Sequence, residues 1–326
     1  MDAQTGWAIG KDNLWRTTNG GAAWHKVTPK GDSRALFQQV GNQRDFSFLS
    51  PSAAWMVGGQ NYQYLYRTTD GGQHWKRFSI PSNINNPKTG TVTNVDFVNS
   101  QSGWMVISLG AAMGREREAI YRTSNGGHNW TLESTSTFAD STGVAAQSPQ
   151  TAWMGQALPM SQVVEARTTD GGSQWHNEKL PPPPGYGLNS PYQGASMYAS
   201  PPVFFSSKDA VIEALPGVQP MVAVFYTTEN GGKTWTPGAV VKGGVKNLTW
   251  SFADVSHGFV SDGRTLYATT DGGAHWRPVQ PNISLAGVTQ LDFISPQNGW
   301  AIVRGQVLIT HDGGRSWSPN EVDPTQ

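Results

Sequence analysis

The 326-residue sequence predicts an all-β fold, a seven-bladed β-propeller of four-stranded antiparallel blades. Three observations lead to this prediction. One eight-residue motif occurs seven times, a shorter motif precedes each copy, and 14 Trp accompany 38 Gly and 21 Pro. This composition is typical of many short strands joined by tight turns, with large aromatic side chains between them.

The longer motif reads Thr, any residue, Asn or Asp, Gly, Gly, two residues and Trp. Its copies span residues 17–24, 68–75, 123–130, 168–175, 228–235, 269–276 and 310–317. The Asn or Asp side chain caps its own backbone in a turn, and the glycine pair accepts positive φ. Each copy is therefore predicted to form a hairpin corner closed by an indole ring. Seven such copies predict a single propeller domain over 1–326.

The shorter motif is a small residue followed by an apolar one, as in Gly6-Trp7 and Gly299-Trp300. Seven residues before the apolar position lies a further small or aromatic residue: Phe48, Phe97, Ala146, Phe204, Phe252 and Phe293. These positions predict strands A to D in each blade, for example 290–294, 299–303, 307–310 and a strand from Trp317 onward. In the first repeat the position for strand A falls before Met1. Blade 1 is therefore expected to have three strands, and Met1 to be an internal start within a longer exported protein.

The long motif resembles the Asp-box, or BNR, repeat of sialidases, the sortilin ectodomain, xyloglucan hydrolases and photosystem II stability and assembly factors. The resemblance covers essentially the whole chain. Residues 295–300 and 66–72 are most similar to the assembly-factor propellers. This resemblance implies a non-catalytic scaffold that binds a protein or peptide segment and lies outside the cytoplasm. The alternative that it implies is a carbohydrate-active propeller, which binds or cleaves glycans.

Composition and spacing argue against several other classes. The formal net charge is zero, which leaves no basic field for nucleic acid. No Cys is present, and no histidines are spaced as zinc ligands, so neither a metal nor a cofactor is expected. No apolar stretch is long enough for direct membrane insertion, and the first ten residues lack the features of a signal peptide.

Catalysis is the less favoured hypothesis. The Arg-Ile-Pro motif that the sialidase resemblance requires is missing, and carboxylates outside the boxes are few. Asp96 and Asp292 are able to line a central channel as a hydrolase pair. They occupy equivalent positions of two repeats, however, and are more simply structural. No catalytic residue is therefore assigned.

Long insertions fall in the B-to-C and D-to-A connections, at 29–43, 79–91, 108–119, 176–201 and 213–221. Recognition is often carried by long loops on a rigid scaffold, so this face is a candidate binding surface. In the longest insertion a run of four prolines is followed by Tyr186, Tyr192 and Tyr198. Their rings are suited to contact a peptide or the face of a sugar; the alternative is that they pack on the scaffold itself. Another holds Arg115 and Arg117, which alternate with glutamates and read most simply as a solvated loop.

A second candidate surface comes from the residue directly before each box. That residue is arginine in the first four blades and uncharged in the last three: Arg16, Arg67, Arg122 and Arg167, then Thr227, Ala268 and Ile309. Four cations at equivalent positions predict a contiguous arc that binds carboxylates or backbone carbonyls of a partner segment. The resemblance to assembly-factor propellers implies the same role. The alternative is that each arginine stacks on a Trp or pairs with a neighbouring blade.

Overall fold

The computed structural model describes residues 4–9, 13–21, 23–30, 46–59, 62–81, 91–113, 115–158, 163–184, 197–216, 222–242 and 248–319. Within these residues all regular structure is β-strand, and the sheets are those of a seven-bladed β-propeller, as the sequence predicts. The chain forms two compact units, one of Met1–Gln156 with Ala166–Glu178 and one of Ala157–Glu165 with Lys179–Gln326.

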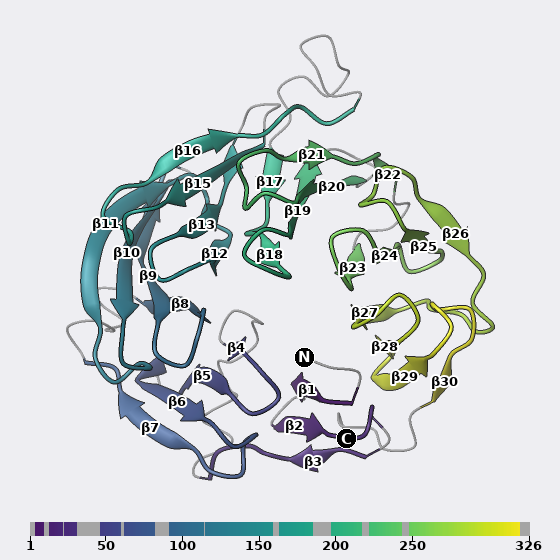
Figure 1. Cartoon of the computed structure of the whole chain (residues 1–326), viewed down its shortest axis with the longest axis horizontal. Helices are drawn as coiled ribbons and strands as arrows, with labels where there is room; N and C mark the ends of the chain where they lie inside the picture. The colour runs from purple at the N-terminus through teal and green to yellow at the C-terminus, as the bar shows by residue number, and fades with distance from the viewer. Residues whose placement is uncertain are drawn as a thin grey trace. The chain divides into compact units, whose positions relative to one another are not determined.

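The first unit carries blades 1 to 4, except for Val164, Glu165 and Lys179 of blade 4. Their strands are β1 (Gly6–Ile9), β2 (Leu14–Thr17) and β3 (His25–Lys26); β4 (Phe46–Phe48), β5 (Ala54–Gly58), β6 (Tyr64–Thr68) and β7 (Lys76–Ser79); β8 (Thr91–Phe97), β9 (Gly103–Ala112), β10 (Arg115–Thr123) and β11 (Thr131–Phe138); and β12 (Gly143–Ala146), β13 (Ala152–Gly155), β15 (Val164–Thr168) and β16 (His176–Lys179). Figure 1 shows β4, β8 and β12 along one side of these sheets and β7, β11 and β16 along the other. The described part of blade 1 has three strands, which confirms that expectation.

The second unit carries blades 5 to 7. Their strands are β18 (Val203–Phe204), β19 (Ala210–Pro216), β20 (Val222–Thr228) and β21 (Thr236–Pro237); β23 (Thr249–Phe252), β24 (Gly258–Ser261), β25 (Leu266–Thr269) and β26 (Arg277–Val279); and β27 (Val288–Phe293), β28 (Gly299–Val303), β29 (Gln306–Thr310) and β30 (Ser318–Pro319). The sheet of blade 5 is extended by β14 (Ala157–Leu158), β17 (Met197–Ala199) and β22 (Val241–Lys242). Short loop segments thus add strands to this blade.

Two insertions contain more strand than the sequence indicates. The sequence predicts a loop for residues 108–119, but these residues extend β9 and β10 into a long hairpin in which Glu118 pairs with Ser108. It also predicts a loop at Glu213, which instead lies within β19. In both places the alternation of side chains along a strand decides which residues face inward. Charged residues obscure this alternation at 115–118, and two prolines and a glycine obscure it after Glu213.

Box turns and A-to-B turns lie at the same end of each blade, as the antiparallel order predicts. The first glycine of the box donates its N–H to a carbonyl of the A-to-B turn, or of the equivalent segment before β1, in all seven blades, for example from Gly71 to Ser52 at 2.8 Å and from Gly126 to Gln101 at 2.7 Å. This hydrogen bond joins the two turns of a blade. The same end of the blade therefore holds both connections whose length is constant.

The core consists of aromatic side chains packed between neighbouring blades. Trp55 of β5 stacks on Phe97 of β8 with ring centroids 4.0 Å apart, and Phe259 of β24 stacks on Phe293 of β27 at 3.5 Å. In each pair, strand B of one blade meets strand A of the next. Burial of these rings between two sheets stabilises the packing of each first strand against the preceding blade.

Candidate functional site

The box residues stabilise turns. In the second box the hydroxyl of Thr68 accepts the N–H of Gly72 at 2.8 Å and donates to Asp70 Oδ1 at 2.9 Å. Asp70 in turn accepts the N–H of His74 at 2.9 Å, and this bond holds the pKa of Asp70 down, at about 2. The hydrogen bond from the threonine hydroxyl to the third box residue is present in all seven boxes. The boxes are therefore engaged in folding.

The arginine that precedes each of the first four boxes lies over the tryptophan of strand B in its own blade. In three blades the two residues form a cross-strand pair: Trp7 with Arg16, Trp55 with Arg67, and Trp104 with Arg122. The distances from the guanidinium carbon to the ring centroid are 5.7, 5.4 and 5.4 Å, and Arg167 lies 4.8 Å from Trp153. These are cation–π contacts, which fix the side chain along the sheet.

The guanidinium groups of Arg16, Arg67 and Arg122 reach the box turn of the following blade. Arg16 Nε donates to the carbonyl of Pro51 at 3.0 Å, and a β-carbon placed on Gly71 would come within 2.6 Å of Arg16 Cζ. Arg122 Nη1 donates to the carbonyl of Gly171 at 3.2 Å and to Gln150 Oε1 at 3.3 Å. The first box glycine thus leaves the space that the arginine of the preceding blade fills.

These contacts correspond to the alternative in which the arginines stack on Trp and pair with the next blade. They leave part of each side chain accessible, because all four arginines are only half-buried. Among the described residues, only Arg122 has a carboxylate within ion-pair distance, that of Glu133 at 3.8 Å. The four arginines thus combine a structural contact with a charge that is largely unneutralised.

Arg115 and Arg117 form a separate group. Both are exposed on one side of β10, near the tip of the hairpin. Arg122 lies seven residues along the same strand from Arg115, which at about 3.4 Å per residue is roughly 24 Å away. The structure therefore does not bring Arg115 and Arg117 together with the arginines before the boxes.

Of the three tyrosines in the longest insertion, Tyr186 and Tyr192 lie outside the described residues. Tyr198 is in β17, where it is paired with Leu215 and 46% exposed. The proline run before it is anchored at Pro181, whose carbonyl accepts the hydroxyl of Tyr226 at 2.8 Å. Tyr198 therefore presents a partly exposed ring on a strand that is paired with β14 and β19.

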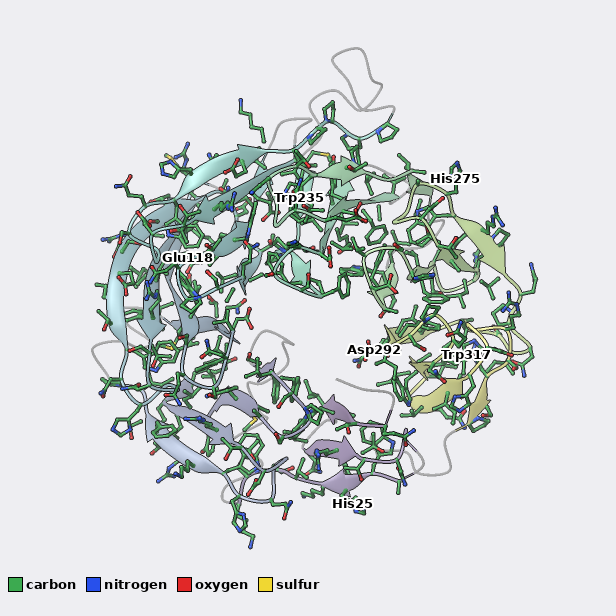
Figure 2. All side chains as sticks on the ribbon, viewed as in Figure 1. His25, Glu118, Trp235, His275, Asp292 and Trp317 are labelled. Atoms are coloured by element: carbon green, nitrogen blue, oxygen red, sulfur yellow. The ribbon has the colours of Figure 1, made fainter. Side chains whose placement is uncertain are left out.

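Buried carboxylates are the functional candidates that sequence reasoning missed. Glu118, Glu165 and Glu213 lie within strands (Figure 2 labels Glu118), and burial raises the pKa of each, to about 7 for Glu118 and Glu213 and well above the ordinary value for Glu165. Among the described residues Glu118 Oε1 accepts the hydroxyl of Ser141 at 2.9 Å, whereas neither oxygen of Glu165 has a partner. Side chains alternate between the two faces of a strand. A glutamate at a position that this alternation turns inward is the sequence signal that would have identified them.

The two aspartates considered for catalysis occupy equivalent strand positions but have different surroundings. Asp96 accepts the hydroxyl of Ser47 at 3.2 Å and the N–H of Ala146 at 2.8 Å, so it joins three adjacent first strands. Burial raises its pKa to about 6 despite these bonds. Asp292 accepts the hydroxyl of Ser251 at 3.4 Å. The residue as a whole is exposed, but desolvation of its carboxyl group by the surrounding protein raises its pKa.

Metal-binding clusters and membrane-spanning helices are both absent from the described part of the chain. No three or more His, Cys, Asp or Glu side chains of these residues are placed to hold a metal ion together. These residues also include no helix whose length and apolar character would let it cross a membrane.

Comparisons with known proteins support the propeller fold and the resemblance to Asp-box propellers. The family model described as "Sortilin, neurotensin receptor 3" matches residues 12–157. The structure titled "YCF48 bound to D1 peptide" superposes with a TM-score of 0.58 at 18% identity, covering 96% of this chain and 87% of that one. The crystal structure of an ancestral GH74 enzyme superposes with a TM-score of 0.54 at 13% identity, covering 98% of this chain.

These likenesses establish the fold. This chain spans 45% of the GH74 enzyme, and at such identities both superpositions show the fold alone. A search of curated proteins found no match. The family model covers blades 2 and 3 and parts of blades 1 and 4, and the matched residues include Arg16, Arg67 and Arg122 but not Arg167.

Proposed function

We propose that this Asp-box propeller is a non-catalytic scaffold that binds an extended protein segment through Arg16, Arg67, Arg122 and Arg167. The observation that carries the proposal is the surroundings of these four cations, namely their position, their burial and the scarcity of anionic partners around them. They occupy equivalent positions of consecutive blades, they are half-buried, and three of them have no carboxylate partner among the described residues.

A guanidinium that has lost water without gaining an anion favours an added carboxylate. Arg67 is the clearest case, because burial lowers the pKa of its guanidinium and its Nε has no hydrogen-bond partner among the described residues. The planar guanidinium group of arginine is able to bind a carboxylate through two parallel hydrogen bonds. The favoured partner is therefore a segment with an acidic side chain or a free C-terminal carboxylate.

Fold-level likeness supports this proposal. The YCF48 structure was solved with a D1 peptide bound, so a propeller of this fold accommodates a peptide. The proposal includes a location outside the cytoplasm, which is in keeping with the match to the sortilin family model. The exposed cations Arg115 and Arg117, and Tyr198 of β17, are proposed as secondary contacts on other surfaces.

A carbohydrate-active propeller is the second candidate. The raised pKa of Asp96, about 6, is the kind of value a general acid requires, and the ancestral GH74 enzyme shares the fold. The hydrogen bonds from Ser47 and Ala146 to Asp96 favour a structural role instead. Turnover of a glycosidase substrate that is abolished by Asp96→Asn or Asp292→Asn would establish the second candidate over the first.

Binding of an acidic peptide tests the first candidate. The probe is a fluorescent octapeptide with two glutamates and a free C-terminal carboxylate, and the variant is R67Q/R122Q. Glutamine keeps part of the stem, so the fold survives a loss of about 0.5–2 kcal/mol for each cation–π contact. We expect the Kd of the variant to rise at least tenfold and to become less dependent on salt.

The matched control is R264Q/R277Q, which removes the same charge from two exposed positions of blade 6 that are not proposed as contacts. It should bind the peptide as the wild type does. Equal affinity of R67Q/R122Q and wild type, or an equal loss in both variants, would contradict a role for the arginines before the boxes.

A further inference from the structure

The hairpin of β9 and β10 is the longest in the described part of the chain. Its strands have ten and nine residues, whereas the corresponding strands of blades 2 and 7 have five each. Gly110 of β9 and the residue before it lie opposite Arg117 alone, and this bulge shifts the register between Glu116 and Glu118. Gly110 has a φ of 103°, and no atom of the described residues lies within 4 Å of the point where its β-carbon would be. The outer part of the hairpin, 109–117, thus joins the blade at a bulge with open space around its glycine.

Glu116 and Glu118 of β10 meet at this bulge. Residues two apart on a strand share a face, and Glu118 is on the face that packs on blade 4, so Glu116 is there as well. Glu118 is 1% exposed and Glu116 is half-buried. Their carboxyl groups lie within hydrogen-bonding reach of each other. Arg115 and Arg117 are exposed on the opposite face, and neither forms an ion pair with a described residue. The described residues therefore place no cation beside the two carboxyl groups.

The surroundings of Glu118 supply one hydrogen-bond donor. Its Oε1 accepts the hydroxyl of Ser141 at 2.9 Å, whereas its Oε2 is buried and finds no donor among the described residues. Gln156, which binds the same connection as Ser141, is engaged elsewhere. Its Oε1 accepts the N–H of Ala139 at 3.2 Å, and its Nε2 donates to a side chain of β16 at 3.0 Å. A protonated Glu118 satisfies Oε2 by donating to Glu116, but an ionised Glu118 is a buried charge with a single donor.

Glu116 is the one ionisable side chain among the described residues that acts on the pKa of Glu118. The residues opposite Glu118 in the sheet are Ser108 of β9 and Ser136 of β11, both uncharged. Blade 4 presents Met154 of β13 to the same face. The charged and titratable residues of the neighbouring segments are exposed or half-buried and do not affect Glu118: Arg122, Glu133, Asp140, His176 and Glu178. The proton balance of this site thus involves the two glutamates alone.

We infer that Glu116 and Glu118 form a pH-sensitive latch, which fixes residues 109–117 to the blade when the two carboxyl groups share a proton and releases them when both are ionised. Burial raises the pKa of Glu118 to about 7, and the neighbouring Glu116 contributes to the rise. The proton is therefore held at about pH 5.5 and lost at about pH 8.5.

Release follows from the geometry of the bulge. Two carboxylates within hydrogen-bonding reach repel each other, and in a buried site this repulsion is much stronger than in water. Movement of the hairpin about Gly110 brings both groups into water without breaking the apolar contacts further along β10, such as those of Ile120. The hairpin carries the exposed Met113, Arg115 and Arg117, so the latch controls how this surface is displayed. The latch does not depend on the proposed function.

Hydrogen exchange read by mass spectrometry tests the latch. We would measure exchange at about pH 5.5 and 8.5 and divide each rate by the intrinsic rate at that pH. In the wild type the protection of amides in 109–117 should fall about tenfold or more between the two pH values, and amides of β24 in blade 6 should lose far less. Unchanged protection of 109–117 would overturn the inference. An equal loss in both regions would do so too, because it marks global unfolding.

Glu118→Gln should keep the hairpin fixed at both pH values. The glutamine stays neutral, its oxygen still accepts the hydroxyl of Ser141, and its amide group is able to donate to Glu116. Protection of 109–117 in this variant should change by less than about twofold between the two pH values. Thermal unfolding checks that the variant is folded. A folded variant that loses protection as the wild type does would contradict the inference.

Glu116→Gln separates the latch from the burial of Glu118 alone. A glutamine amide at this position is able to donate to the ionised Glu118, so the release at high pH should largely disappear. The matched control is Glu178→Gln at a half-buried position of β16, which should follow the wild type. Wild-type release in Glu116→Gln would show that the second glutamate has no part in the response, and would refute the latch.

Trypsin cleavage locates the release. Arg115 and Arg117 are exposed cleavage sites on the hairpin, and Arg264 is an exposed site in blade 6. At about pH 8.5 the wild type should be cleaved after Arg115 and Arg117 roughly fivefold faster than Glu118→Gln, and after Arg264 at the same rate. Because both proteins are digested at one pH, the activity of trypsin is the same for both. Equal cleavage rates at the hairpin sites would contradict the inference.

Discussion

The guanidinium of Arg67 in blade 2 occupies the space that a β-carbon on Gly126 of blade 3 would take. Gly126 also has a φ of 72°, so the residue serves two purposes. Its positive φ allows the turn, and its missing side chain lets the arginine of the preceding blade lie against the box. The same relationship joins Arg16 to Gly71 and Arg122 to Gly171.

Gly126→Ala is expected to destabilise the protein more than a comparable substitution in open space. Gly263 is the matched control, because it has a φ of 80° and no atom lies within 4 Å of the point where its β-carbon would be. Gly263→Ala should cost about 1 kcal/mol from the strained backbone alone. Gly126→Ala should cost a further 1–3 kcal/mol or so from the displaced arginine, measured by denaturant unfolding.

A double-mutant cycle identifies the arginine as the cause. In the Arg67→Ala background the extra cost of Gly126→Ala should shrink, but part should remain because the carbonyl of Ser100 would lie 2.9 Å from the new β-carbon. Additive effects of the two substitutions would show that the guanidinium does not depend on the glycine.

Ser47→Ala is expected to cost about 1–3 kcal/mol of unfolding free energy. The hydroxyl of Ser47 accepts the N–H of Phe97 at 2.9 Å and donates to Asp96, so its removal leaves a buried donor unsatisfied. Ser251→Ala should behave alike, because Ser251 accepts the N–H of Phe293 at 2.8 Å. The exposed Ser79 is the control, and Ser79→Ala should change stability by less than about 0.5 kcal/mol. Equal effects at Ser47 and Ser79 would contradict the role given to these hydroxyls.

The sequence predicts the propeller well because its repeat is local. The box places Thr, Asp and the glycine pair within one turn, and the small-aromatic motif follows strand A at a fixed spacing, so seven copies define seven blades. The three-stranded blade 1 follows from the same register. These features depend on hydrogen bonds between residues close in the sequence and on the alternation of apolar and polar residues along strands. Both leave patterns that can be read directly from the sequence.

The site is less predictable because its contacts link separate blades. The number of residues between Trp and the paired Arg varies with the B-to-C loop, which hides the cross-strand pair of Trp104 and Arg122. The packing of that arginine on Gly171 of the next blade has no sequence signal. Glu118 reads as part of a solvated loop because its neighbours are charged, and only the strand register turns it inward.

The burial of Glu118 makes stability depend on pH. Its pKa is raised from 4.5 to about 7 in the folded protein, chiefly by desolvation, so the folded state holds the proton more tightly than the unfolded state does. The stabilising contribution is fully present below pH 4.5 and is lost as pH rises through about 7. At about 1.4 kcal/mol per pKa unit, the loss is on the order of 3 kcal/mol.

Glu118→Gln should remove this part of the pH dependence. Glutamine stays neutral and its side-chain oxygen still accepts the hydroxyl of Ser141, so the variant should gain stability relative to wild type as pH rises from 4.5 to 7. Denaturant unfolding at several pH values measures the difference, and Glu229→Gln at an exposed position is the control, which should follow the wild-type curve. Other buried acids, including Glu213, contribute to the absolute curve but cancel in the comparison. Parallel curves for Glu118→Gln and wild type between pH 4.5 and 7 would show that Glu118 does not titrate in this range.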